Sequence, residues 1–272
     1  MKESVKVSIV TINLNNREGL KKTIDSVVSQ TFEDFEWIVI DGGSTDGSKE
    51  LIEQYSNHIA YWVSEPDGGI YSAMNKGIRA AKGEYCFFLN SGDYLIDGSI
   101  LQKALDFKFD EDVVWGYFMF NRGDHCEVGD SPKEISLNTF VERTIHHTGN
   151  VFIRRILFNN DIYGMYDESL KIVSDWKWFL QALGLGTATG RYIDLMMSVY
   201  DGTGISESQY GLMEKERISV LHELIPERIL KDYKYFLHLK KTNEEYFYTL
   251  HSIKRLFVVL IKTIVKRIIG RK

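Results

Sequence analysis

Four short, largely apolar runs occur in the first ninety residues of the chain. They lie at Val5–Leu14, Glu36–Ile40, Ile59–Val63 and Tyr85–Leu89, and each is long enough for one β-strand. The last run, YCFFL, is apolar on both faces, as in a strand buried on both sides. The pattern predicts four strands in this part of the chain.

Apolar residues at helical spacing separate these runs. Leu20, Ile24, Val27 and Val28 recur at i, i+4, i+7 and i+8, and Asn16 stands where an N-cap is expected. Two further helices are predicted, one carrying Leu51, Ile52 and Tyr55 and one over Ile70–Ala81. Alternating strands and helices predict an α/β fold, a mostly parallel sheet with helices on both faces. Such sheets bind ligands at the carboxyl ends of their strands.

The rest of the chain divides less clearly. Residues from about Val113 to Tyr200 mix short strands and loops with one helix expected near Asp175–Leu183, and from about Tyr210 the pattern is helical. No Gly/Ser/Pro linker and no internal repeat is evident. We therefore expect a catalytic domain over residues 1–208 and a C-terminal helical region over residues 209–272.

Composition and charge narrow the class of protein. The chain has 272 residues, 44% of them hydrophobic, and three prolines, which excludes a disordered or fibrous chain. Its two cysteines, Cys86 and Cys126, form no CxxC pair, which favours a reducing, cytoplasmic compartment. The first apolar run is too short for a secretory signal. Of the net charge of −5, residues 251–272 contribute seven positive charges and no acid, so residues 1–250 carry −12. An acidic body argues against nucleic-acid binding.

Polar clusters follow all four predicted strands, at residues 13–16, 41–48, 65–69 and 90–93, and three of them allow two interpretations each. DGGSTDG at 41–47 is not a P-loop, because a P-loop needs lysine directly after its second glycine and Ser48 follows Gly47 here. It is not an EF-hand loop either, because the third and twelfth residues, which must supply oxygen ligands, would be Gly43 and Ile52. What remains is a carboxylate and a glycine turn, suited to a nucleoside's N–H or hydroxyl; a capped βα turn is the alternative.

The other two clusters allow similar pairs of interpretations. Asn90–Asp93 places an acid where a buried strand ends, as for Mg²⁺ or Mn²⁺ on a diphosphate, or forms a simple turn. Glu65–Tyr71 places two glycines before a helix N-terminus, where backbone N–H groups favour phosphate; a helix start capped by Asp67 is the alternative.

Together these segments resemble the family 2 glycosyltransferases with the GT-A fold, especially their bacterial exopolysaccharide, colanic-acid-like branch. The resemblance is carried by VSIVTINLNN at 7–16, DGGSTDGS at 41–48, SEPDGGIYSAMNKGI at 64–78 and FLNSGD at 88–93. It continues more weakly through residues 146–155 and 167–179. The chain contains no QxxRW motif, which processive members of the family carry. The resemblance therefore implies the addition of one sugar per acceptor.

The resemblance also implies roles for single residues on the donor side. Asp93 occupies the last position of the family's DxD motif and would bind Mn²⁺ or Mg²⁺ on the diphosphate. Ser91 replaces the first acid of that motif, which puts the ribose contact of that acid in doubt. The residues expected to bind the nucleotide-sugar are Thr11, Asn13, Asp41, Asp67, Asn75, Lys76 and Ser91.

On the acceptor side, Asp175 in VSDW matches the general base of the inverting family members. A sugar hydroxyl is a poor nucleophile, so a carboxylate must accept its proton in the transition state. An N-cap is the alternative role for Asp175. His146, His147 and Trp176 are expected near the acceptor, although a lone histidine is more often structural.

The expected function is thus an inverting, metal-dependent, non-processive transfer from a nucleotide-sugar, with UDP the expected nucleotide, to a glycan or lipid-linked acceptor in surface polysaccharide synthesis. One alternative function is that of a nucleotidyltransferase, but such enzymes need glycines and basic residues after the first strand, and TINLNN has neither. The other is a nucleotide-sugar-binding protein without turnover, which the replacement of an acid by Ser91 suggests.

The C-terminal segment is the last feature with a predicted role. At helical spacing, residues 251–272 place their apolar residues on one face and basic residues opposite, and the longest apolar run, Leu256–Ile261, is too short to span a bilayer. A basic amphipathic helix of this kind binds the surface of an anionic membrane. We expect peripheral attachment to the inner face of the cell membrane, or packing on protein as the alternative.

Overall fold

The computed structural model describes residues 5–123, 125–147, 149–161, 163–202, 209–240 and 242. The chain divides into two compact units between Val220 and Leu221, and the first holds every site residue predicted above. The predicted boundary at residues 208 and 209 falls just before helix α8 (Tyr210–Leu224), whose first eleven residues belong to the first unit. The tail at residues 251–272 lies outside the described residues.

Nine strands form one sheet in the described part of the chain, in the order β3-β2-β1-β4-β8-β6-β9-β5 with β7 paired to β6. The strands are β1 (Val7–Asn13), β2 (Phe35–Asp41), β3 (Tyr61–Ser64), β4 (Tyr85–Phe88), β5 (Tyr94–Leu95), β6 (Val113–Asn121), β7 (Cys126–Val128), β8 (Val151–Arg154) and β9 (Gly190–Asp201).

The four strands predicted from the apolar runs form the parallel half of the sheet. β1 pairs in parallel with β2 and β4, and β2 pairs in parallel with β3. The register sets Asn13 of β1 opposite Asp41 of β2, and Asp41 opposite Ser64 of β3. The polar residues that end these strands therefore meet at one edge, as the α/β pattern predicts.

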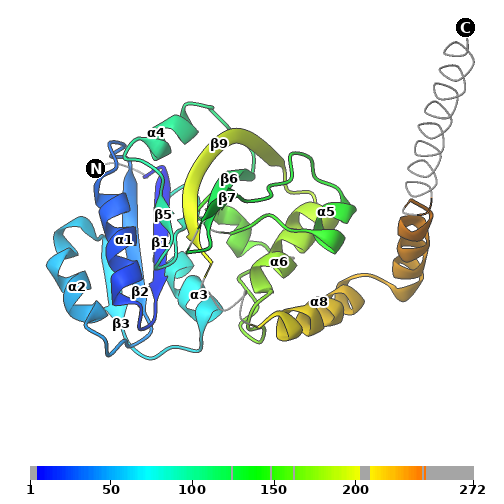
Figure 1. Ribbon diagram of the computed structural model, residues 1–272, viewed down its shortest axis with the longest axis horizontal. Coiled ribbons are helices and arrows are strands. Elements are labelled where there is room, and N and C mark those ends of the chain that lie inside the picture. The colour runs from blue at the N-terminus through cyan, green and yellow to red at the C-terminus, as the bar shows by residue number, and fades with distance from the viewer. Residues whose placement is uncertain are drawn as a thin grey trace, which may run out of the picture. The chain divides into compact units, whose positions relative to one another are not determined.

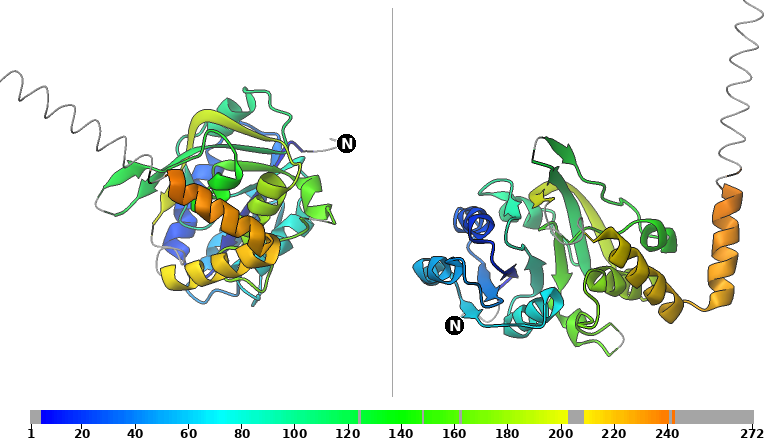
Figure 2. Two further views of the ribbon diagram at one scale, coloured as in Figure 1. Left: turned by 90° about the vertical axis from the view of Figure 1, so that its right-hand side faces the viewer. Right: turned by 60° about the horizontal axis from the view of Figure 1, so that its bottom comes forward.

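The other half of the sheet is mixed. β8 is antiparallel to both β4 and β6, so β6 and its parallel neighbour β9 run in the same direction as β4. β9 bends across the sheet to pair with β5 as well (Figure 1), and the β6–β7 hairpin extends from the body of the first unit in both views of Figure 2. Because of these directions, Asp201 at the end of β9 lies at the same edge as the ends of β1, β2 and β4.

Helices cover both faces of the parallel half, as predicted. The buried Leu20, Ile24 and Leu51 of α1 and α2 pack with Ile9 on one face, whereas α3 packs on the other, where a Cβ at Gly77 would collide with Val10. The helices are α1 (Arg17–Val28), α2 (Ser48–Gln54), η1 (Ser56–His58), α3 (Ile70–Ala80), α4 (Ile100–Leu105), α5 (Leu137–Glu142), η2 (Arg155–Asn159), α6 (Ser174–Phe179), η3 (Leu180–Leu185) and α8.

Local signals in the sequence place several helix boundaries. Asn16 caps α1 as predicted, since its side chain accepts a hydrogen bond from Gly19 N at 3.1 Å. The helix expected over Asp175–Leu183 is α6, which continues as the π-helical turn η3. Residues 227–240 form a further helix in the second unit.

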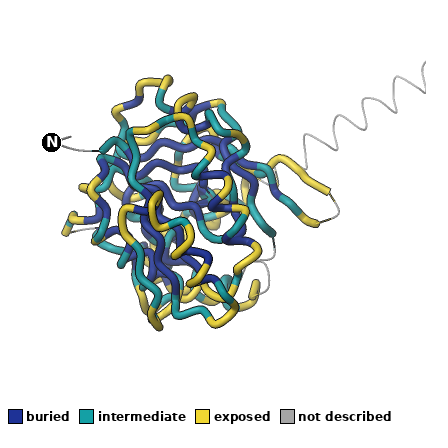
Figure 3. The backbone as a smooth tube through the Cα atoms, turned by 90° about the vertical axis from the view of Figure 1, so that its left-hand side faces the viewer, coloured by how far each residue is buried: buried dark blue, intermediate teal, exposed yellow. Residues whose placement is uncertain are grey.

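The core follows the centre of the sheet, where the buried stretches of Figure 3 run between exposed loops. β4 is buried on both faces, as its sequence predicts: Tyr85, Phe87 and Phe88 are each at most 1% exposed. Burying an aromatic side chain of this kind contributes about 1.5–3 kcal/mol. The core thereby fixes the strand ends that carry the polar residues.

Candidate active site

The ends of β1 and β2 are joined by a dense set of hydrogen bonds around Asp41. Its carboxylate accepts from Asn13 Nδ2 at 2.7 Å, Ser64 Oγ at 2.6 Å and Ser44 N at 2.9 Å. Burial raises the pKa of Asp41, but the hydrogen bonds from Ser44, Ser64 and Asn13 outweigh it and leave the pKa below its ordinary value. Asp41 is therefore a fixed carboxylate that positions its neighbours.

Asn13 has one polar atom that the protein does not satisfy. Its Nδ2 donates to Asp41 and, at 3.2 Å, to Ser44 Oγ, while its Oδ1 is buried and accepts no hydrogen bond within the described chain. A buried acceptor of this kind calls for a donor from water or a ligand. Asn13 thus offers an acceptor where the nucleoside is expected.

Thr11 lies behind this acceptor and is fully buried. Its hydroxyl accepts a hydrogen bond from Trp37 Nε1 at 3.0 Å. Thr11 therefore has no accessible atom with which to contact the nucleotide-sugar, because the residue is enclosed in the core.

The loop before α3 packs directly on the turn after β2. Asp67 Oδ1 accepts from Gly69 N at 2.9 Å, and its other carboxylate oxygen would lie 3.0 Å from a Cβ at Gly42. Gly43 has a φ of +80°, and a Cβ there would lie 3.0 Å from Pro66 N. The glycines thus allow two loops from different strand ends to meet, which brings Asp67 beside Asp41.

Two residues of α3 that were predicted to bind the nucleotide-sugar interact with other protein residues. Asn75 Nδ2 donates to Tyr166 O and to Glu168 Oε1, each at 2.9 Å, and its Oδ1 accepts from Tyr166 N at 3.0 Å. Lys76 Nζ pairs with Glu65 at 2.7 Å. Asn75 is buried with its polar atoms all used, so its place in the structure is that of a tie between α3 and residues 166–168, not of a donor contact.

Asp93, just before β5, and Asp201, at the end of β9, form a pair of carboxylates. Asp93 is 4% exposed, and its Oδ1 accepts from Asp201 N at 2.9 Å. Burial raises the pKa of Asp93 to about 8; the Asp201 N–H opposes this rise, and the charge of Asp201 adds to it. Two carboxylates held together in this way fit Mn²⁺ or Mg²⁺, because a divalent cation would relieve their repulsion. No group of three metal-ligating side chains occurs in the part of the chain that is described.

The neighbours of this acid pair include Ser91 and Gly92. Asn16 Nδ2 donates to Ser91 O at 3.0 Å, and its distance to Ser91 Oγ is 3.4 Å. Gly92 has a φ of +106°, and a Cβ there would lie 3.3 Å from Asp201 Oδ2. Sequence reasoning missed Asp201, although it follows the same signal as the other site residues: an acid before glycine where a strand ends.

Asp175, the expected general base, stands in the first turn of α6. The single proton of Tyr71 Oη is shared between two acceptors, Asp175 Oδ1 at 2.9 Å and Ile172 O at 2.5 Å. Burial raises the pKa of Asp175, and the Tyr71 hydrogen bond and the charge of Arg217 lower it in part. The side chain of Val173, not that of Asp175, is at the N-cap position, and no side-chain cap bond forms there. The N-cap alternative for Asp175 is therefore wrong.

The three residues expected near the acceptor differ in accessibility. His147 is 6% exposed, packs against Phe88 and Tyr166, and has no partner for either ring nitrogen within the described residues. Burial lowers its pKa to about 3. Trp176 is also buried and donates to Phe140 O at 2.8 Å. His147 and Trp176 are thus core residues, whereas His146 is only half-buried and packs on Phe118.

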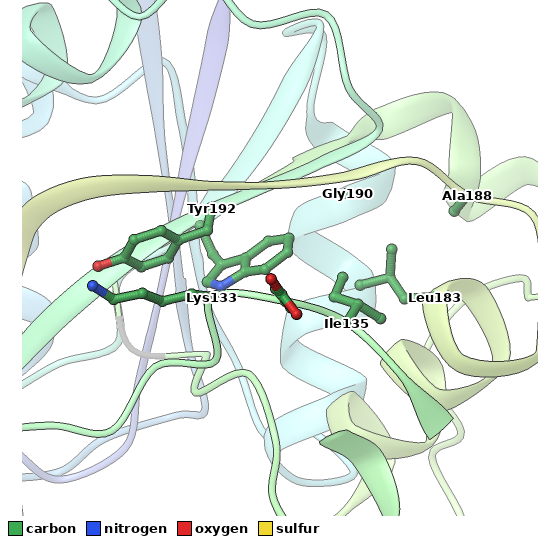
Figure 4. A pocket seen from close by; sticks show the side chains of 8 residues that line it. Lys133, Ile135, Leu183, Ala188, Gly190 and Tyr192 are labelled. Atoms are coloured by element: carbon green, nitrogen blue, oxygen red, sulfur yellow. The ribbon is translucent and has the colours of Figure 1, made fainter. Parts of the chain in front are cut away.

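A separate hollow of about 460 Å³ opens at the opposite end of β6 and β9 (Figure 4). Lys133 Nζ lies 5.5 Å from the centre of the Tyr192 ring at its rim. Trp115 and Gly190, which also line it, stand near the first residues of their strands, whereas Asp201 ends β9. This hollow is therefore distinct from the edge that carries the predicted residues.

The described helices include none with the length and apolar character needed to cross a bilayer. Both cysteines in the described chain are unbridged.

Comparison with known proteins gives concordant matches. A family model described as "Glycosyl transferase family 2" matches residues 8–157. "Uncharacterized glycosyltransferase Rv1514c" from Mycobacterium tuberculosis (strain ATCC 25618 / H37Rv) is 33% identical over 182 residues, which cover 65% of this chain and 68% of that protein.

Solved structures share the fold at low sequence identity. S. aureus TarS 1-349 in complex with UDP-GlcNAc superposes with a TM-score of 0.64 at 22% identity, covering 79% of this chain and 66% of that one. Mannosyltransferase PcManGT from Pyrobaculum calidifontis in complex with GDP-Man and Mn²⁺ gives 0.55 at 15% identity, covering 74% and 57%. The chain spans 40% of the longer TarS structure.

Proposed function

Since the chain belongs to glycosyl transferase family 2, we propose that it transfers one sugar from a UDP-sugar, with inversion, to a glycan or lipid-linked acceptor. Binding of UDP-GlcNAc by TarS supports UDP as the nucleotide. The colanic-acid-like branch rests on the motifs at 7–16, 41–48, 64–78 and 88–93, whereas the relative compared above is mycobacterial.

One observation carries this proposal: α3 links the donor side to the base. The Asp67–Gly69 loop lies at the N-terminus of α3, beside the turn after β2, and Tyr71 in its first turn holds Asp175. A helix N-terminus favours the binding of diphosphate, and the carboxylate of Asp175, held by the first turn of α3, can receive the proton of the acceptor hydroxyl. The arrangement suits direct displacement at the anomeric carbon.

The donor would be held mainly by Asn13, Asp41 and Asp67. The buried Oδ1 of Asn13 would accept the imide N–H of uracil, and the carboxylate of Asp67 would accept ribose hydroxyls. Asp41 keeps Asn13 in place through the 2.7 Å hydrogen bond. Lys76 can reach the diphosphate only when it leaves Glu65.

Asp93 would hold a divalent cation together with the diphosphate, and Asp201 is the second carboxylate available. Mn²⁺ bound with GDP-Man by PcManGT supports this assignment. A bound cation would neutralise the charge that develops on the leaving diphosphate. Ser91 keeps its place through Asn16 and contributes a hydroxyl and a carbonyl to the same loop.

Asp175 would accept the proton of the attacking hydroxyl. Its carboxylate must be ionised to do so, and Tyr71 favours that state by donating to it. Burial raises the pKa of Tyr71 far above its ordinary value, and the charge of Asp175 adds to the effect, so the phenol stays a donor at working pH.

Thermal stabilisation by nucleotides tests this function. UDP with Mn²⁺ should stabilise the full chain more than GDP, dTDP or UDP without metal, by about 2.7 kcal/mol at 100 times its Kd. Asp93→Ala should lose the metal-dependent part. Stabilisation by dTDP alone would redirect the donor class, and no response to any nucleotide would refute the proposal.

The rival without turnover is separated by Asp175→Asn. An enzyme loses transfer in this variant and keeps UDP binding, whereas a binding protein has no transfer to lose. Hydrolysis or transfer from a panel of UDP-sugars by the wild-type chain is the readout.

A further inference from the structure

Helix α8 is anchored to the segment that leads to the base. Glu216 accepts hydrogen bonds from three successive backbone N–H groups, those of Lys171 at 2.8 Å, Ile172 at 3.0 Å and Val173 at 3.3 Å. Asp175 follows two residues later. Hydrogen bonds to a charged acceptor are stronger than those between neutral groups, so this part of α8 is fixed beside the acceptor side of the site.

The next residue, Arg217, is held over Trp176. Its guanidinium carbon lies 4.9 Å from the centre of the Trp176 ring, and one N–H group donates to Arg143 O at 2.8 Å in an exposed contact. This contact with the indole face favours one placement of the planar group, whose several N–H donors can also bind an anion.

Arg217 has no ion-pair partner among the residues that the structure describes. Within the described chain, no carboxylate forms an ion pair with it, and its one hydrogen-bond partner is a neutral carbonyl. Burial lowers its pKa, and the charges of Glu214 and Asp175 offset this only through space. A partly buried cation without a paired anion is costly, so the binding of an anion here would offset that cost.

We propose that Arg217 binds an anionic group of the acceptor, a phosphate or a carboxylate, beside the hydroxyl that Asp175 deprotonates. This inference rests on the proposed function. The fork of N–H groups on a guanidinium matches both anions in a bidentate manner. Burial lowers the pKa of His146 and the nearby charge of Arg217 lowers it further, whereas the charge of Asp130 raises it. The acceptor is accordingly a negatively charged saccharide and not a neutral one.

Binding of small probes to the full chain tests the inference. Protein saturated with UDP and Mg²⁺, so that the diphosphate site is filled, is titrated with phenyl phosphate, phenyl β-D-glucuronide and the uncharged phenyl β-D-glucoside. We expect at least one anionic probe to bind about tenfold or more tightly than the glucoside. Arg217→Gln should remove that preference, and Arg217→Lys should keep part of it.

Arg143→Gln is the matched control, because Arg143 meets Arg217 only through its backbone carbonyl. This variant should bind the probes as the wild type does. A preference for phenyl phosphate would indicate a phosphate-linked acceptor, and a preference for the glucuronide an acidic sugar.

Equal affinity for all three probes, or an unchanged preference in Arg217→Gln, would overturn the inference. Saturation by UDP is measured first in the same samples. A chain that binds UDP but shows no anion preference refutes only the role of Arg217, whereas a chain that does not bind UDP refutes the proposed function.

Discussion

Tyr71 and Asp175 lie 104 positions apart in the sequence, and their side chains meet in a 2.9 Å hydrogen bond. The same hydroxyl shares its proton with Ile172 O at 2.5 Å, so the phenol spans the start of the base-bearing helix. Tyr71 belongs to the loop-and-helix unit on the donor side. The donor and acceptor halves of the site are therefore coupled through one buried hydroxyl.

Tyr71→Phe should shift the pH dependence of transfer. Removal of the hydrogen bond removes an effect that lowers the pKa of Asp175, so that pKa rises and the base is ionised only at higher pH. The acid limb of the kcat/KM profile should move to higher pH, with little change in UDP affinity. Burial and the charge of Arg217, which also act on the pKa of this carboxyl, stay in place.

Tyr166→Phe is the matched control for that experiment. Its hydroxyl is buried near Asp175 and has no hydrogen-bond partner in the described chain. Its removal should leave the acid limb unchanged and should not lower the melting temperature, because an unsatisfied buried hydroxyl is lost. Equal shifts in the two variants would show that Tyr71 acts only by packing.

Asp175→Asn should lower kcat by on the order of 10²–10⁴, the range expected for loss of a general base. The amide cannot accept the proton but keeps the size of the side chain. UDP stabilisation should be unchanged, and circular dichroism checks the fold. Asp167→Asn serves as a control, because Asp167 pairs with Lys177 of α6 and the proposal gives it no part in the transfer. Retained transfer in Asp175→Asn would mean that another group is the base.

The four parallel strands and α3 followed from the sequence because buried strands and amphipathic helices have distinct periods. The same reasoning could not tell which residues of a motif are buried in the core and which line the site. His147 and Trp176 were expected at the acceptor, but packing against Phe88 and Phe140 encloses them, and only tertiary contacts decide which face of a segment is buried.

Asp201 was missed for a different reason. It lies 108 residues from Asp93, and the antiparallel pairing of β9 with β5, which sets Val199 opposite Tyr94, brings the two acids together. Glu216 and Arg217 look like solvent-exposed charges on a C-terminal helix. Their partners are backbone amides and an indole, for which a sequence gives no complementary signal.

The tail at residues 251–272 should bind anionic vesicles. Each basic residue near an anionic surface contributes on the order of 1 kcal/mol, so replacing Lys262, Lys266 and Arg267 by Gln should weaken binding to phosphatidylglycerol vesicles strongly. Replacement of Lys231, Lys234 and Lys240 by Gln is the control with the same change in charge. Flotation at low and high salt measures both, since screening should mimic the tail substitution. Equal loss in the two variants would indicate a non-specific charge effect.

Asp93 should make the metal-free protein less stable as the pH rises. Its folded pKa of about 8 exceeds the ordinary value of 3.8, so the folded state binds more protons than the unfolded state between these values. Stability therefore falls with rising pH across that window and is fully reduced above about pH 8. Asp93→Asn removes the titration and should raise the stability of the metal-free chain at pH 8 by more than about 1 kcal/mol. Asp106→Asn, which changes an exposed acid at the end of α4, should not raise the stability.

Mn²⁺ should reverse the order of stability of the wild type and Asp93→Asn, because it stabilises the wild type by binding the ionised carboxylate and finds no such ligand in Asp93→Asn. Melting curves at pH 6 and pH 8, with and without Mn²⁺ and UDP, measure all four states. A wild type that is equally stable at both pH values, and that Mn²⁺ does not affect, would remove Asp93 from the metal site.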